Sequence, residues 1–384
     1  MTSKVPLLAA FAKDLYHCSD CNYCVDAVWA ERGIDHVCPT LQHHSPLMSF
    51  SGRGYLAAAR AWFEGQELDL DALSERVFTC TTCGNCEQIC PIGLHPTAVG
   101  RALRGELQQR NVMPQPVRDL LRGMREDGNP NGVARSDRMA WQQARTSAAA
   151  EHVLYLPGCA AATAIPAEAQ AAVELMAAAG YVVQTLENDD TCCGAPLFEL
   201  GDETSATSLI EALAEKVRAA STVVISGLEC ARSWQRLNDA NLQPVTFNEL
   251  IMTALSTQRL HLNPRATLPP RVFVLDSCQS RTALAPGRAL RQLLTALGIA
   301  TKPSVDAARF IVCCGAAGGM PQVEPVAADR MADARLLDAG ADAVVVGADP
   351  RCVAHLRRAQ RDAGPRVFGL AEFLNTYFTH DQNR

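Results

Sequence analysis

Four cysteines are crowded into the stretch CTTCGNCEQICPIG, which runs from Cys80 to Gly93. Their spacing is C-x2-C-x2-C-x3-C, and Pro91 follows the last cysteine. Three thiolates at this spacing can wrap one face of a cubane iron–sulfur cluster, while a cysteine that precedes proline completes a neighbouring cluster. Structural zinc sites more often separate two C-x2-C pairs on distinct knuckles, so the pattern favours [4Fe–4S] over zinc.

All sixteen cysteines of the chain fall into four groups of four. The groups are Cys18, Cys21, Cys24 and Cys38; Cys80, Cys83, Cys86 and Cys90; Cys159, Cys192, Cys193 and Cys230; and Cys278, Cys313, Cys314 and Cys352. Disulfide scaffolds are typical of small secreted domains, whereas this chain has 384 residues and is 48% hydrophobic. The cysteines therefore indicate metal or redox chemistry.

We expect the two N-terminal clusters to exchange their fourth ligands, as in bacterial ferredoxins. This assigns one [4Fe–4S] cluster to Cys18, Cys21, Cys24 and Cys90, and the other to Cys38, Cys80, Cys83 and Cys86. Thirteen residues separate Cys24 from Cys38 where three are standard, but Pro39 preserves the Cys-Pro signature. The nearby histidines are interpreted as surface residues or as residues that contact the ligands, rather than as iron ligands; they are His17, His36, His43 and His44.

A repeat with a period of about 120 residues fills the rest of the chain. VLYLPGC (153–159) matches VFVLDSC (272–278), TCCGAP matches VCCGAA, and TVVISGLEC matches AVVVGADPRC. Apolar strand runs alternate with helical stretches in each copy, which predicts a parallel α/β sheet in each. We also expect each pair of adjacent cysteines to leave a strand into a glycine turn, which allows backbone to approach a cofactor closely.

The remaining cysteines of each copy then follow predicted strands directly. Cys159, Cys230, Cys278 and Cys352 lie just beyond carboxyl ends of strands, at the edge where open α/β sheets bind ligands. The fold class is therefore an α+β multidomain protein. We expect an α-helical ferredoxin-like domain with two [4Fe–4S] clusters at 1–110, a linker at 111–150 that contains REDGNPNG, and duplicated α/β domains at 151–265 and 266–384.

Composition excludes several classes of function. The net charge of −6 and a pI of about 5.9 offer no basic face, so nucleic-acid binding is not expected. No apolar run approaches the ~20 residues that span a bilayer, so membrane attachment is expected only through a partner. The first residues, MTSKVPLLAAFAKD, weakly imitate a signal peptide but are interpreted as a short helix packed on the first metal group.

The chain resembles the iron–sulfur proteins with two CCG (cysteine-rich) domains, as in heterodisulfide reductase and the iron–sulfur subunits of glycolate oxidase and anaerobic glycerol-3-phosphate dehydrogenase. The resemblance rests on the ferredoxin groups, SGRGYLAAARAWFEG, GNPNG and both CCG copies. It implies an electron-transfer subunit that relays electrons from a FAD-dependent 2-hydroxyacid or glycerol-3-phosphate dehydrogenase to quinone or another membrane electron carrier. Its place would be the cytoplasm, or the inner face of the membrane through that partner.

In the heterodisulfide reductases that this chain resembles, each complete CCG motif ends in C-x2-C, and its five cysteines can hold a noncubane cluster that carries out disulfide chemistry. Here Gly227 and Asp349 stand at the first position of that pair. The alternative functions are a catalytic thiol–disulfide reductase and a scaffold whose CCG copies hold structural zinc. One CCG copy could also hold zinc or be empty. The sequence carries no glycine-rich nucleotide fingerprint and no nucleophile signature, so neither a flavin or nicotinamide site nor a catalytic residue is assigned. Arg232, Arg281 and Arg351 are interpreted as solvated.

Overall fold

The computed structural model describes residues 5–29, 34–142, 151–281, 286–302, 311–360 and 364–381. The chain divides into two compact units, each assembled from three segments. The first unit comprises Met1–Arg122, Pro196–Ala206 and Val305–Arg335; the second comprises Gly123–Ala195, Thr207–Ser304 and Leu336–Arg384. No helix in the described ranges is both long enough and apolar enough to cross a membrane.

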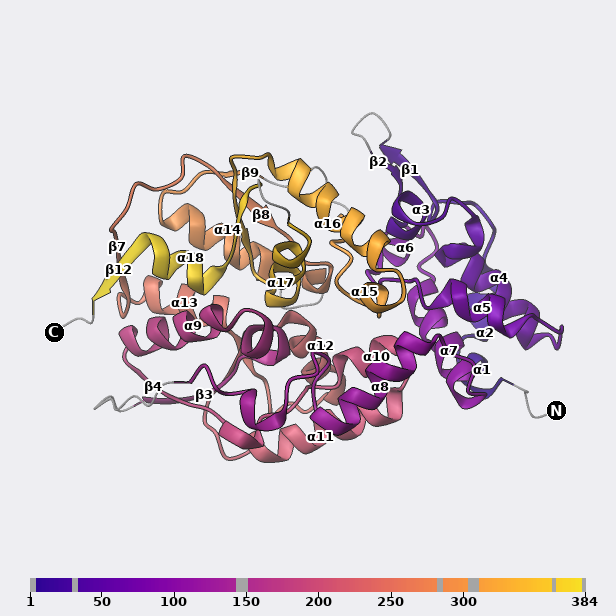
Figure 1. The fold of residues 1–384 in the computed structure, drawn as a ribbon, viewed down its shortest axis with the longest axis horizontal. Helices are drawn as coiled ribbons and strands as arrows, with labels where there is room; N and C mark the ends of the chain where they lie inside the picture. Colours follow the sequence, from indigo (N-terminus) through magenta and orange to yellow (C-terminus); the bar gives the residue numbers. More distant parts are fainter. Residues whose placement is uncertain are drawn as a thin grey trace. The chain divides into compact units, whose positions relative to one another are not determined.

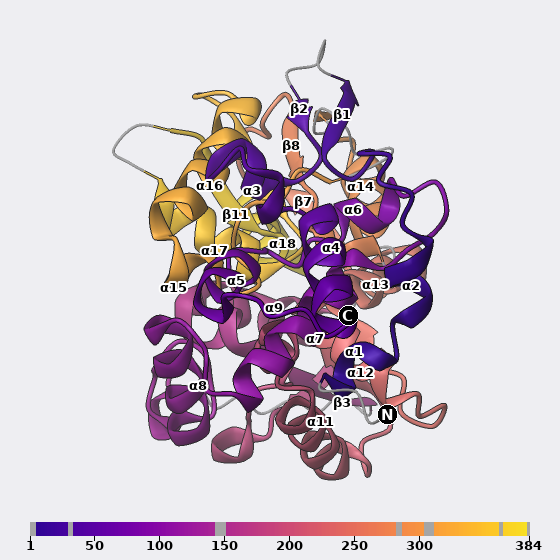
Figure 2. The same ribbon diagram turned by 90° about the vertical axis from the view of Figure 1, so that its right-hand side faces the viewer.

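The first unit is mainly helical, and its helices α4, α5 and α7 are labelled in Figure 2. Ser51 caps α4 and Asp69 caps α5, each by accepting a backbone N–H three residues later. Its elements are α1 (Pro6–Ala9), α2 (Ala12–His17), α3 (Pro39–His43), α4 (Gly52–Phe63), α5 (Leu70–Val77), α6 (Asn85–Gln88), α7 (Pro96–Gln109), α15 (Met320–Val323), most of α10 (Ala195–Leu200) and α16 (Pro325–Ala339), and the antiparallel hairpin of β1 (Asp26–Trp29) and β2 (Ile34–His36).

Helix α8 (Gln115–Asp127) lies in the segment that the sequence assigns to a linker. Val117, Leu121 and Met124 recur at helical spacing and are each at most 2% exposed. Burial of this stripe explains why the segment is helical rather than irregular. The boundaries of the three sequence-predicted domains stay a prediction.

The second unit contains two four-stranded parallel sheets, which confirms the expected duplication of an α/β unit. The strand orders are β4-β3-β5-β6 and β9-β8-β10-β11, so both copies arrange their strands as 2-1-3-4. The strands are β3 (Glu151–Leu156), β4 (Tyr181–Gln184), β5 (Val223–Ile225) and β6 (Val245–Thr246), then β8 (Val272–Leu275), β9 (Thr301–Lys302), β10 (Val344–Gly347) and β11 (Arg366–Gly369). The central strands β5, β8 and β10 are buried throughout, as parallel sheets covered on both faces require.

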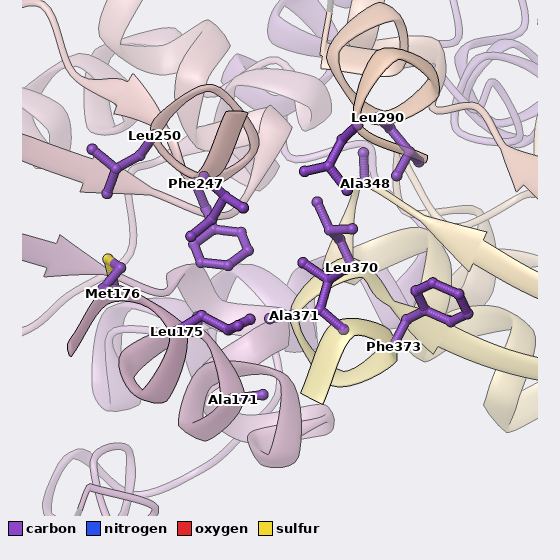
Figure 3. Close-up of a cluster of buried hydrophobic side chains, with 14 of the residues drawn as sticks. Ala171, Leu175, Met176, Phe247, Leu250, Leu290, Ala348, Leu370, Ala371 and Phe373 are labelled. Carbon is purple, nitrogen blue, oxygen red and sulfur yellow. The ribbon is translucent and has the colours of Figure 1, made fainter. Parts of the chain in front are cut away.

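Helices α9, α13, α14 and α18 lie between the strands of the two sheets (Figure 1). Their apolar side chains join residues of both sheets in one hydrophobic core, in which Leu175, Phe247, Leu290 and Phe373 are each at most 2% exposed (Figure 3). The helices of this unit are α9 (Pro166–Ala178), α11 (Glu203–Val217), α12 (Leu228–Leu237), α13 (Phe247–Ser256), α14 (Pro286–Ala296), α17 (Pro350–Ala359) and α18 (Leu370–Tyr377). The strands β7 (His261–Pro264) and β12 (Phe378–Asp381), which follow equivalent helices, pair antiparallel.

The expected strand immediately before the adjacent cysteines is wrong for the first copy. Strand β4 ends at Gln184, and a 3-10 turn at Glu187–Asp189 intervenes before Cys192. In the second copy, residues 303–310 lie outside the described ranges. The glycine turn itself is confirmed, because Gly194 and Gly315 have φ of 77° and 89°.

Candidate metal centres

The loop from Cys18 to Cys24 follows helix α2 and depends on two residues in the left-handed region. Asp20 has φ of 55° and Asn22 has φ of 66°, which short polar side chains tolerate better than most. Arg53 on α4 donates to Asp20 Oδ1 over 3.2 Å and also to Asn22 Oδ1. These contacts hold the turn that carries the first three thiols.

Cys90 lies close enough to Cys18 and Cys24 for their thiols to interact electrostatically. Burial raises the pKa of Cys24 to about 11, and the Cys18, Cys21 and Cys90 thiols add to this shift. Cys90, which the sequence predicts to be the fourth ligand of this cluster, therefore lies near Cys18 and Cys24. The ligation itself stays a prediction.

In the second set, Cys38 likewise lies near cysteines of the group that it is expected to complete. Burial, with smaller contributions from the Cys80 and Cys83 thiols, raises the pKa of Cys38 to about 12. The pKa of Cys86 is also well above its ordinary value because of burial, with smaller contributions from Glu87 and Cys83. A metal must displace these protons to bind, so loading of the set depends on pH.

Backbone amides point at sulfurs of both sets. The N–H of Thr82 donates to Cys80 Sγ over 3.3 Å, and the N–H of Leu94 donates to Cys90 Sγ over 3.4 Å. Hydrogen bonds to ligand sulfurs stabilise the negative charge of a cluster and adjust its reduction potential. Two sets of four thiols with such donors fit two [4Fe–4S] clusters in chemistry and number.

The first CCG copy brings its four thiols together in the second unit. Cys159, Cys192, Cys193 and Cys230 are all at most 6% exposed. The sulfur of Cys193 lies 3.0 Å from that of Cys230, and Cys192 is hydrogen-bonded to both Cys159 and Cys193. These bonds lower the pKa of Cys159 and Cys193 and keep the pKa of Cys192 and Cys230 well above the ordinary value. Such a set of soft thiolates suits iron–sulfur or zinc.

The strand ends position Cys159 and Cys230 as the sequence predicts. Strand β3 ends at Leu156, three residues before Cys159, and Gly158 between them has φ of 77°. Strand β5 leads into α12, and Cys230 lies in the first turn of that helix.

The GNPNG stretch, which the sequence assigns to a connecting loop, is part of this site. The Gly128 carbonyl accepts the N–H of Cys192 over 3.1 Å. Asn131 Nδ2 donates to Thr163 Oγ1 over 2.6 Å and to the Cys159 carbonyl over 3.5 Å. The loop therefore hydrogen-bonds both the segment that carries Cys159 and the segment that carries Cys192.

A buried ion pair beside the site was not predicted from the sequence. Arg138 Nε donates to Asp190 Oδ2 over 2.6 Å, and the two side chains are 1% and 3% exposed. The guanidinium also hydrogen-bonds the Cys159 sulfur and lowers the pKa of that thiol, after the larger effect of Cys192. Arg138 stands alone between irregular residues, so no periodicity or motif indicates its role.

The second CCG copy places two of its cysteines at strand ends. Cys278 follows β8, and Cys352 lies in the first turn of α17 after β10. Cys313 and Cys314 belong to the first compact unit, where the N–H of Gly315 donates to Cys313 Sγ over 3.4 Å. Across the described ranges, no three His, Cys, Asp or Glu side chains are grouped as a site for one metal ion. The ligand sets therefore stay predictions.

The two positions that lack a fifth cysteine have clear local roles. Asp349 caps α17 by accepting the N–H of Arg351 over 3.1 Å, and its other oxygen accepts the Ser277 hydroxyl over 2.6 Å. Both carboxylate oxygens are thus engaged as hydrogen-bond acceptors. Gly227 precedes α12, and a Cβ there would lie 3.2 Å from the Cys230 sulfur.

Arg232 connects the two copies and is not the solvated residue expected. Its Nη1 donates to Gln279 Oε1 over 2.5 Å, and Gln279 Nε2 lies 3.9 Å from Cys278 Sγ. Arg351 lies close enough to the buried Glu229 carboxyl to oppose the rise in its pKa, which burial and then Asp349 cause. The side chain of Arg281 lies outside the described residues.

The comparisons with known proteins give two families. Residues 14–94 match the 4Fe-4S dicluster domain, and residues 153–231 and 272–357 each match the cysteine-rich domain. Together these matches follow the order of domains expected from the sequence.

Several known proteins are similar to this chain over most of its length. A subunit of dihydromethanophenazine:CoB–CoM heterodisulfide reductase from Methanosarcina acetivorans is 25% identical over 75% of this chain and 74% of its own length. The glycolate oxidase iron-sulfur subunit of Escherichia coli is 24% identical over 90% of both chains. EtfAB:quinone oxidoreductase of Syntrophomonas wolfei is 23% identical over 78% of this chain and 46% of its own length.

Proposed function

Since the chain belongs to the iron–sulfur proteins that join a 4Fe-4S dicluster domain to two cysteine-rich domains, we propose that it is the electron-transfer subunit of an oxidoreductase complex. A separate FAD-dependent dehydrogenase, acting on a 2-hydroxyacid such as glycolate or lactate or on glycerol 3-phosphate, supplies the electrons. Quinone or another membrane carrier receives them. The subunit works in the cytoplasm, held at the inner face of the membrane by a partner.

The observation that carries the proposal is the residue at each missing-cysteine position. Gly227 has no side chain to offer a metal, and the Asp349 carboxylate is engaged by Ser277 and by the amide of Arg351. A carboxylate is also a harder ligand than iron–sulfur chemistry favours. With four thiolates in each copy, an ordinary cluster that passes electrons is better supported than an opened cluster that cleaves disulfides.

Bound clusters would take up and release single electrons over a wide range of potentials. The chain's own residues would supply thiolates, in the sets Cys18, Cys21, Cys24 and Cys90; Cys38, Cys80, Cys83 and Cys86; Cys159, Cys192, Cys193 and Cys230; and Cys278, Cys313, Cys314 and Cys352. Amides such as those of Thr82 and Leu94 stabilise the sulfurs. Iron–sulfur clusters or zinc in the CCG copies are both compatible with these donors.

The second candidate is a catalytic thiol–disulfide reductase. The similarity to the heterodisulfide reductase of Methanosarcina acetivorans favours it. In the first copy, hydrogen bonding lowers the pKa of Cys193 well below the ordinary value, which is a property of reactive thiols. The absent fifth cysteine weighs against it in both copies.

The test uses the full chain, reconstituted with iron and sulfide without oxygen. We expect dithionite to bleach its visible absorption, while glycolate, lactate and glycerol 3-phosphate are not oxidised in the presence of a dye acceptor. A range of disulfides is then offered to the reduced protein, and thiol release is followed; we expect none above the rate of dithionite alone.

Three outcomes would contradict the proposal. Substrate oxidation by the flavin-free chain would make it the dehydrogenase itself. Thiol release that disappears in Cys193→Ser or Cys314→Ser would make it the reductase. Zinc in place of iron at all sites, with no reducible cluster, would make it a structural protein.

A further inference from the structure

Arg104 is an almost fully buried cation in the first unit. It lies on helix α7 and is 1% exposed. Its Nε donates to the Val77 carbonyl over 2.9 Å, and Nη2 donates to Val77 and to the Cys80 carbonyl, each over 2.6 Å. Nη1 donates to the carbonyls of Glu199 over 2.6 Å and Gly318 over 3.0 Å. One side chain thus gathers four backbone carbonyls.

These carbonyls come from segments that each stand close in sequence to cysteines. Cys80 is itself a predicted ligand of the second N-terminal cluster. Glu199 is in helix α10, six residues after Cys193, and Gly318 is four residues after Cys314. The Arg104 guanidinium therefore joins the loop that carries Cys80 to the segments that follow the two CCG motifs.

Gly318 shows how closely these segments approach. It has φ of 69°, and a Cβ on it would lie 2.2 Å from the Cys80 carbonyl oxygen and 3.0 Å from Thr81 Cα. Its N–H donates to the Glu199 carboxylate over 3.0 Å. Any side chain at this position would push the loop of 311–319 off the loop that carries Cys80.

The charge of Arg104 also reaches the predicted cluster. Arg104 donates to the Cys80 carbonyl, and it stabilises the Cys80 thiolate electrostatically. In a buried setting such an interaction is little screened by solvent. A reduced cluster carries one more negative charge than an oxidised one, so a fixed cation stabilises the reduced form.

We propose that Arg104 is a positioning residue that holds the Cys80 loop against Gly318 and raises the reduction potential of the cluster at Cys38, Cys80, Cys83 and Cys86. The proposal rests on the electron-transfer function proposed above. It makes this cluster a stronger electron acceptor than it would be without the arginine. The step is the gain or loss of one electron by the cluster, with dithionite as reductant, and no bond is made or broken.

The experiment is an anaerobic redox titration of the full, reconstituted chain, followed by electron paramagnetic resonance. Cys38→Ser identifies the signal of the cluster in question. Arg104→Gln should lower the equilibrium constant for reduction of that cluster at least tenfold, which is about 59 mV for one electron. The other N-terminal cluster should shift less. Arg104→Lys keeps the charge and should restore at least half of the shift.

Arg122→Gln is the matched control, because it removes an arginine that is 62% exposed and pairs with Asp119 on helix α8. It should leave both potentials unchanged. Iron content and thermal unfolding of each variant show whether it has folded and loaded. If the Arg104→Gln chain does not take up its clusters, the Arg104→Lys chain decides the matter. Failure of Arg104→Lys to take up its clusters as well would mean that the several N–H donors of the guanidinium, and not its charge, are essential. That result would overturn the claim about the reduction potential.

An unchanged potential in a loaded Arg104→Gln chain would overturn the proposal. Equal shifts of both clusters, or the same shift in Arg122→Gln, would also do so, because the effect would then be general. The wild-type chain separates this test from that of the proposed function. If wild type has two reducible clusters and only the arginine effect is missing, the electron-transfer function stands; if wild type has none, both fall.

Discussion

Glu168 is a buried carboxyl that fastens helix α9 to helix α18. Its two oxygens accept the N–H groups of Ala371 and Glu372 over 3.0 and 2.9 Å, at the amino end of α18. A Cβ on Gly369 would lie 2.2 Å from the carboxyl carbon, so the group packs directly on backbone. Burial raises its pKa from 4.5 to about 7, although the two amides oppose the rise.

The sign of the pH dependence follows from this shift. The folded chain holds the proton more tightly than the unfolded chain, so protonation of Glu168 favours folding. Its contribution is fully present below pH 4.5 and is lost as pH rises through about 7. A shift of 4.5 to about 7 corresponds to about 3 kcal/mol at 1.36 kcal/mol per unit, of which about 2 kcal/mol falls between pH 5.0 and 7.5.

The perturbation is Glu168→Gln, which cannot titrate. We expect the difference in unfolding free energy between wild type and variant to fall by about 2 kcal/mol from pH 5.0 to pH 7.5, because only wild type loses this contribution. Thermal unfolding at each pH, monitored by far-UV circular dichroism, measures it. Glu174→Gln is the control, since Glu174 also bonds α18, through Asn375 over 2.7 Å, but is only partly buried. Parallel pH profiles for wild type and Glu168→Gln would refute the reasoning.

Two further predictions concern the metal sites. Cys90→Ser should abolish the cluster of the group at 18, 21 and 24 and spare the other, while Cys38→Ser should do the reverse; resonance spectra that lose the same cluster in both would contradict the exchange. Arg138→Met should cost about 3 kcal/mol by leaving the Asp190 carboxylate buried without its cationic partner, or roughly 6–12 °C in Tm at 2–4 °C per kcal/mol. Arg138→Met/Asp190→Leu should recover most of this loss, and a double variant as unstable as the single one would show that the pair is not the cause.

The fold and the cysteine positions were largely readable from the sequence. Apolar runs of strand length alternating with helices predict the parallel sheets, and a cysteine just beyond such a run must lie at the carboxyl edge. Cys159 and Cys278 are found there. Val117 and Leu121 repeat at helical spacing, which predicts helix α8. The Gly, Pro and Asn residues that follow favour a loop, and for that reason the sequence predicts a linker for the whole segment.

The polar residues around the sites were not readable, for a physical reason. Arg104 and Arg138 are single residues whose roles depend on carbonyls and carboxylates brought close by tertiary packing. Arg104 meets Gly318 across 214 positions, and Arg138 meets Asp190 across 52. No local spacing encodes such partners, and an arginine on a helix is more often solvated. Asn131 belongs to the GNPNG motif, but nothing in that motif indicates that its amide reaches the Cys159 carbonyl.

The make-up of the first unit bears on how the protein can be synthesised. Its three segments end at Arg122, Ala206 and Arg335, with parts of the second unit made in between. A nascent chain that has left the ribosome only as far as residue 122 carries all eight N-terminal cysteines but lacks the Glu199 and Gly318 carbonyls that enclose Arg104. The backbone support of the Cys80 loop is therefore complete only after both adjacent-cysteine motifs have been translated.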